Sequence, residues 1–96
     1  MLTLDSVKSI LTSNKMMLKK KYHLKNIGVF GSYSRQEQTA KSDVDVLVEF
    51  AKPVGFEFIE LADELEKLLN HKVDLVSRGA IKPRLLKSVE DDLIYV

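Results

Sequence analysis

The sequence has 96 residues, of which 45% are apolar and 30% are charged, and a formal net charge of +1. Its length fits one domain spanning residues 1–96, and the near-neutral charge makes direct nucleic-acid binding unlikely. The absence of cysteine excludes disulfides and thiolate metal sites, and no apolar stretch reaches membrane-spanning length, so we expect a cytoplasmic protein without a membrane partner.

The first third of the chain predicts a helical region followed by a strand. Apolar residues recur at three- and four-residue steps between Leu4 and Tyr22, and Thr3 or Asp5 is placed to cap the start. Asn14 interrupts this spacing, which leaves open two short helices in place of one. The stretch "NIGVFGS" then predicts a buried strand at residues 26–32 that ends in a turn, and the polar residues 33–41 predict a loop beginning with one helical turn.

The rest of the chain alternates strands and helices. The run "VDVLVEF" predicts a strand at residues 44–50, and "HKVDLVS" predicts a second one at 71–77 in which Asp74 is expected to be buried. Pro83 fits the first position of a helix reaching about Glu90, and residues 93–96 are expected to form an extended tail. Between the strands, residues 55–70 predict the clearest helix. Its expected apolar stripe consists of Phe56, Ile59, Ala62, Leu65, Leu68 and Leu69.

This order of elements predicts an α/β fold with a small mixed sheet flanked by helices. The helix between the strands at 44–50 and 71–77 makes a right-handed crossover, so these two strands are expected to be parallel. The strand at 26–32 ends in Gly31 and Ser32, whereas Asp43 begins the next strand. These two ends lie close together only if the first pair of strands is antiparallel. With the parallel pair, this gives a mixed sheet of three strands.

Three aspartates are expected to share one surface of this sheet. Asp43 and Asp45 are two residues apart, so their side chains point to the same face of the strand, and Asp74 lies on the neighbouring strand. Three carboxylates without nearby histidine or cysteine suit Mg²⁺ or Mn²⁺. Because Mg²⁺ completes its coordination shell with waters and phosphate oxygens, the acids predict a phosphorylated substrate.

The Gly31-Ser32 pair supplies the complementary part of such a site. Glycine lets the backbone approach an anion closely, and a serine hydroxyl can donate to phosphate oxygens. Arg35 is a candidate for a further phosphate contact, with a solvated loop residue as the alternative. The combination predicts a triphosphate cradle beside two metal ions, in which nucleotidyl transfer proceeds by in-line displacement. Asp74 is the candidate that helps to activate the attacking hydroxyl.

The spacing of Gly31-Ser32, ten residues, Asp43-Val44-Asp45 and the later Asp74 resembles the minimal nucleotidyltransferase family of the DNA polymerase β superfamily. "GVFGSYSR", "SDVDVLVEF" and "KVDLVS" extend the resemblance over nearly the whole chain. It implies the polymerase β-like fold, ATP as substrate with Mg²⁺, and a role as the antitoxin in a hetero-oligomer with a HEPN-domain ribonuclease toxin. Relatives commonly have glycine where this chain has Gln36, which leaves the role of Arg35 open.

Three functions are compared on this basis. The first is an enzyme that transfers AMP to a tyrosine hydroxyl of the toxin and so neutralises it; the alternative is a non-catalytic antitoxin that acts by binding and occlusion. A nucleotidyltransferase acting on small molecules ranks last, because so short a chain has little left to form an acceptor pocket. The apolar tail residues Leu93, Ile94 and Tyr95 either contribute to a docking surface or complete the core.

Overall fold

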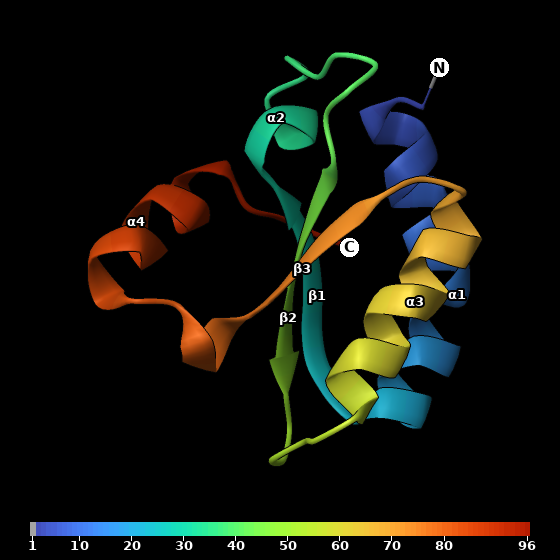
Figure 1. Ribbon diagram of the computed structural model, residues 1–96, viewed down its shortest axis with the longest axis vertical. Helices are drawn as coiled ribbons and strands as arrows, with labels where there is room; N and C mark the ends of the chain where they lie inside the picture. The colour runs from blue at the N-terminus through green and yellow to red at the C-terminus, as the bar shows by residue number, and fades with distance from the viewer. Residues whose placement is uncertain (1) are drawn as a thin grey trace.

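The computed structural model describes residues 2–96. A twisted sheet lies at its centre, with helices α1 and α3 on one face and α4 on the other (Figure 1). Among the described residues, no helix combines the length and the apolar character needed to cross a membrane. In chain order the elements are α1 (Leu4–Tyr22), β1 (Leu24–Phe30), α2 (Gly31–Ser34), β2 (Val44–Phe50), α3 (Glu57–Leu69), β3 (Val73–Ser77), the 3-10 turn η1 (Arg78–Ala80), α4 (Pro83–Asp92) and β4 (Ile94–Tyr95).

The sheet is mixed and has the strand order β3-β2-β1-β4. β1 is antiparallel to β2 and β4, and β2 is parallel to β3, which confirms the expected α/β class and the direction of the first three strands. The expected number of three strands is wrong, because the tail adds β4 to the free edge of β1. A Cβ at Gly28 would lie 2.8 Å from Leu93 Cδ1 and 3.0 Å from the Ile94 carbonyl oxygen, so the small residue on β1 lets this tail approach.

The N-terminal region is one helix of 19 residues. Thr3 Oγ1 accepts a hydrogen bond from the Ser6 amide at 3.1 Å, which confirms Thr3 as the cap. Asn14 does not divide the helix, because its Nδ2 donates to the Ile10 carbonyl oxygen at 2.8 Å. The polar side chain is thus satisfied within the helix itself, and the alternative of two short helices is excluded.

The main core fills the space between the sheet and the α1–α3 pair. The stripe predicted for α3 is only partly correct: Leu65 and Leu69 are buried, but Phe56 is 82% exposed and Ile59 is 59% exposed. Leu61 is buried instead, because Leu61, Leu65 and Leu69 recur at steps of four residues and form the face of α3 that packs against the core. Phe56 itself precedes the first helical residue. Half-buried Ile94 also packs against this core, so the tail contributes to it.

Candidate functional site

The three predicted aspartates gather at the end of the sheet where β1 runs into α2 and where β2 and β3 begin. Asp45 lies directly opposite Asp74 in the parallel register of β2 and β3, and opposite Phe30 in the antiparallel register of β1 and β2. Val44 and Val46 are fully buried toward α1 and α3, so alternation along β2 directs Asp45 to the other face. Asp43 comes just before β2 and is exposed.

Asp74 is exposed, which corrects the expectation that it is buried. β3 is an edge strand, and an open cleft separates Asp74 from α4 on this face. The carboxylate therefore faces water, although the backbone around it is paired with β2. Asp45 is half-buried between β1 and β3.

Gly31 brings the start of α2 against the Asp45 carboxylate. Its φ of +72° lies in the left-handed region, and a Cβ at this position would overlap Asp45 Oδ2. Glycine adopts this conformation without strain and leaves the carboxylate in its place. The half-buried Ser32 follows in the first turn of α2, so the Gly31-Ser32 pair and the aspartates of β2 and β3 occupy the same end of the sheet.

The electrostatics of this end are dominated by like charges. Burial, which is the largest cause, and the neighbouring carboxylates of Asp74 and Asp43 together raise the pKa of Asp45 from 3.8 to about 6. Arg35 opposes the rise only weakly. Within residues 2–96, no three acidic or histidine side chains are grouped closely enough, as they stand, to hold a metal ion. The site thus concentrates negative charge beside the backbone of Gly31. This combination suits a cationic ligand or an anion that is bound to a metal ion.

A nucleotidyltransferase domain model matches residues 11–96 of the chain. The chain belongs to this nucleotidyltransferase family. Protein MJ0128 of Methanocaldococcus jannaschii, provisionally named as a protein adenylyltransferase, is 55% identical over 98 residues that cover both chains completely. The protein adenylyltransferase MntA of Thermococcus cleftensis is 45% identical over 97 residues, which cover this chain completely and 98% of that one.

Solved structures agree with this assignment. A structure provisionally described as a minimal nucleotidyltransferase aligns with a TM-score of 0.85 at 29% identity and covers 99% of this chain and 97% of that one. A toxin–antitoxin complex with AMP-PNP aligns with a TM-score of 0.73 at 29% identity, covering 86% and 69%. A chain of the complex between a tri-AMPylated HEPN toxin of Shewanella oneidensis and an MNT antitoxin aligns with a TM-score of 0.64 at 29% identity, covering 88% of this chain and 68% of that one. The resemblance to minimal nucleotidyltransferases and the expected enzyme class are confirmed.

Arg35 of this nucleotidyltransferase domain is paired within the protein. Its Nε donates to Glu37 Oε1 at 2.9 Å, and its Nη1 donates to Asp92 Oδ2 at 2.5 Å. Ser34 Oγ donates to the Asp92 carbonyl oxygen, which fastens α2 to the end of α4. The expected phosphate contact of Arg35 stays a prediction. Gln36, in the position where relatives commonly have glycine, has a φ of +57°, so this chain adopts the left-handed conformation without the residue that favours it.

Two residues that support the site, Tyr33 and Asp92, were not among the predicted site residues. Tyr33 is 1% exposed, and its ring packs edge-on against His71 with 5.9 Å between ring centroids. This contact anchors α2 between the loop before β3 and the core. The available signal was an aromatic residue directly after Gly31-Ser32 in an otherwise polar stretch. For Asp92 no local signal exists, because its partner Arg35 is 57 residues away.

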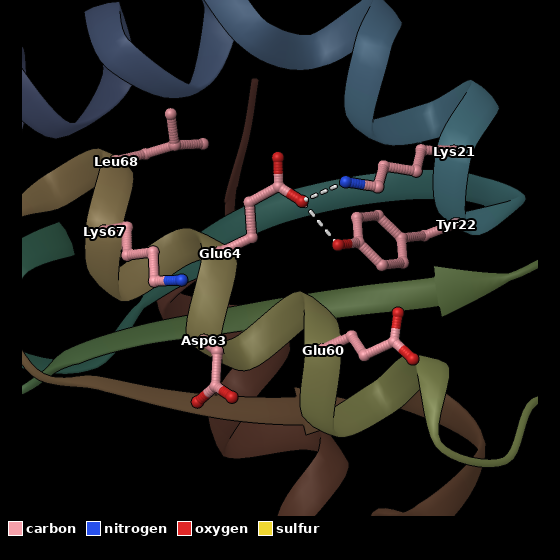
Figure 2. Close-up of a pocket in the computed structure, with 7 residues that line it drawn as sticks. All are labelled: Lys21, Tyr22, Glu60, Asp63, Glu64, Lys67 and Leu68. Atoms are coloured by element: carbon pink, nitrogen blue, oxygen red, sulfur yellow. Dashed lines mark hydrogen bonds and ion pairs between the residues drawn. The ribbon is translucent and has the colours of Figure 1, made fainter.

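A separate cavity of about 520 Å³ lies between α1 and α3, on the other face of the sheet (Figure 2). Glu64 accepts hydrogen bonds from Lys21 Nζ at 3.0 Å and from Tyr22 Oη at 2.5 Å. Burial and the hydrogen bond to Glu64 raise the pKa of Tyr22 to about 12, while the hydrogen bonds from Tyr22 and Lys21 lower the pKa of Glu64. Because these groups satisfy one another, the cluster joins two helices and offers no free catalytic group.

Proposed function

We propose that this nucleotidyltransferase, acting as one domain over residues 1–96, transfers AMP from ATP to a tyrosine hydroxyl of a HEPN ribonuclease toxin and thereby neutralises it. The names of its relatives and the nucleotide-bound and AMPylated complexes of similar structure support this proposal. In the chain itself, one observation carries it: the Asp45 carboxylate lies directly against the backbone of Gly31, where any side chain would displace it, and it is paired in register with Asp74 on the next strand. This arrangement supports a site in which phosphate and metal ligands are neighbours.

The donor chemistry of the residues present suits a divalent metal, although the three carboxylates would have to draw closer together to hold it. Asp43, Asp45 and Asp74 offer only carboxylate oxygens, the donors that Mg²⁺ and Mn²⁺ prefer, and the pKa of Asp45 is raised by burial and by the like charges of Asp74 and Asp43, which a bound cation would offset. We assign these three aspartates as the metal ligands. When bound there, Mg²⁺ supplies Lewis-acid stabilisation to the attacking and leaving oxygens.

The assigned step is an in-line displacement at the α-phosphorus of ATP. The tyrosine oxygen forms a new bond to this phosphorus while the bond to the bridging oxygen of the β-phosphate breaks, and pyrophosphate leaves with that electron pair. Exposed Asp74 is assigned to accept the hydroxyl proton, since it is on the side of Asp45 remote from Gly31 and Ser32. Gly31 and Ser32 are assigned to the triphosphate, and Arg35 would join them after exchanging Asp92 for a phosphate.

The first experiment mixes the chain with a purified HEPN ribonuclease from the same source, ATP and Mg²⁺, and weighs the ribonuclease by mass spectrometry. A gain of one or more AMP units, mapped to tyrosine and lost with Asp43→Asn, is the expected result. The second candidate, occlusion without chemistry, predicts inhibition of the ribonuclease with no gain in mass and with equal strength in Asp43→Asn. That outcome would overturn the transfer reaction.

Two further measurements separate the parts of the site. Ser32→Ala is expected to lower kcat/KM by a factor of about 5 to 150, because a hydrogen bond to a charged group contributes about 1–3 kcal/mol. Mg²⁺ with ATP is expected to raise the Tm of the wild-type chain by mass action, and Asp43→Asn or Asp45→Asn should abolish that rise. An undiminished rise in both variants would remove the aspartates from the site.

A further inference from the structure

A cleft of about 400 Å³ opens beside Asp74, between the sheet and the η1–α4 segment. Asp74 contributes the only carboxylate among its lining residues, and Lys82 contributes the only ammonium group. Leu85 is 52% exposed on the wall formed by α4, so this apolar surface faces water in the chain alone. The remaining walls are formed mainly by Phe30, Val76, Ile81 and Val89.

The position of the cleft follows from the strand order and from the direction of the proposed reaction. Gly31 and Ser32 lie at the end of β1, Asp45 lies on the next strand, and Asp74 lies on the edge strand beyond it. In-line displacement requires the attacking oxygen to approach opposite the leaving pyrophosphate. With the pyrophosphate at Gly31 and Ser32, the attacking hydroxyl comes from the β3 side. Asp74 lines the cleft on this side, and Phe30 of β1 lines it on the other.

We propose that this cleft binds the aromatic ring of the acceptor tyrosine and presents its phenol oxygen to Asp74. The inference rests on the proposed transfer of AMP and deepens it, because it assigns Val76, Ile81 and Leu85 as residues that determine acceptor specificity. A phenol ring has one polar atom, which Asp74 can satisfy, and its remaining surface matches apolar walls. A serine or threonine acceptor would leave most of these walls in contact with water.

The lining disfavours the adenine base as the occupant of the same cleft. A purine carries several hydrogen-bonding atoms along its edge, and burying them without partners is unfavourable. Apart from Asp74 and Lys82, the side chains that line the cleft are apolar. The acceptor ring therefore matches the chemistry of this surface better than the donor base does.

The first test uses neighbouring leucines on α4 as a matched pair. Leu85 lines the cleft, whereas Leu86 lines a different depression beside Phe50 and Arg78. Leu85→Ala is expected to raise KM for the HEPN ribonuclease about tenfold, with the KM for ATP and the Tm shift caused by Mg²⁺ and ATP unchanged, whereas Leu86→Ala leaves the KM for the acceptor unchanged. If Leu85→Ala raised the KM for ATP and not the KM for the acceptor, the assignment would be overturned. Equal changes in the KM for the acceptor in Leu85→Ala and Leu86→Ala would also overturn it.

The second test measures binding without catalysis. N-acetyl-tyrosinamide is expected to shift the backbone amide NMR signals of Val76 and Leu85, whereas adenosine and N-acetyl-serinamide leave them in place. Shifts caused by adenosine alone, or by none of the three compounds, would overturn the proposal. If the tyrosine compound binds in the cleft but the wild-type chain adds no AMP to the ribonuclease, the proposed function fails while the phenol site stands.

Discussion

Replacing Asp45 by asparagine is expected to stabilise the metal-free protein while abolishing AMP transfer. The folded state raises the pKa of this carboxyl from 3.8 to about 6, so it binds a proton more tightly than the unfolded chain does. Ionised Asp45 therefore destabilises the fold above about pH 6, and this cost disappears below about pH 4, where both states are protonated. Two pKa units correspond to about 3 kcal/mol, but contact with water screens a half-buried group and leaves about 1 kcal/mol.

Urea unfolding in EDTA at pH 8 and pH 4 measures this effect. Asp45→Asn is expected to raise the free energy of unfolding by about 1 kcal/mol at pH 8, which corresponds to a Tm about 4–8 °C higher in a domain of this size, and to change it little at pH 4. Asp63→Asn on α3 removes the same charge from an exposed position and serves as the control. An Asp45→Asn variant less stable than the wild type at pH 8, or equally stabilised at both pH values, would refute the electrostatic argument.

Three other substitutions test features of the backbone and core by urea unfolding. Gly31→Ala should lower the free energy of unfolding by at least about 2 kcal/mol through its positive φ and its close contact, whereas Gly79→Ala, with nothing within 4 Å of the added Cβ, should be nearly neutral. Gln36→Gly should raise it by about 0.5–1 kcal/mol, because glycine adopts a φ of +57° without strain. Leu65→Ala should cost about 2–5 kcal/mol, and exposed Ile59→Ala on the same helix less than about 0.5 kcal/mol; equal costs would contradict the inward face of α3.

The arrangement of the aspartates could be predicted because it depends on short-range rules. The two-residue period of a strand places Asp43 and Asp45 on one face, and the right-handed crossover makes the strand of Asp74 parallel to that of Asp45. Gly31 could likewise be placed at the end of its strand. These inferences needed only the order of elements along the chain.

Other features depend on contacts that sequence spacing does not encode. Phe56 and Ile59 fit a helical stripe as well as Leu61 does, so the period alone cannot decide which face of α3 is buried. β4 has two residues, too few for a periodic signal, and it forms because Gly28 admits Leu93 and Ile94. The buried face of α3 and the presence of β4 are therefore determined by packing between segments that are far apart in the sequence.

The C-terminal part of the fold is held in a way that favours local opening. β4 pairs with β1 through only two residue pairs, at Gly28 and Val29, whereas β1 and β2 pair along nearly their whole length. No residue of α4 is fully buried, so this helix is bound to the rest by little apolar contact. Segments of this kind detach at a lower free energy than the central strands, and their amide hydrogens exchange sooner. Because α4 forms one wall of the cleft beside Asp74, its detachment would widen access to the carboxylates while β1, β2 and the α1–α3 core stay folded.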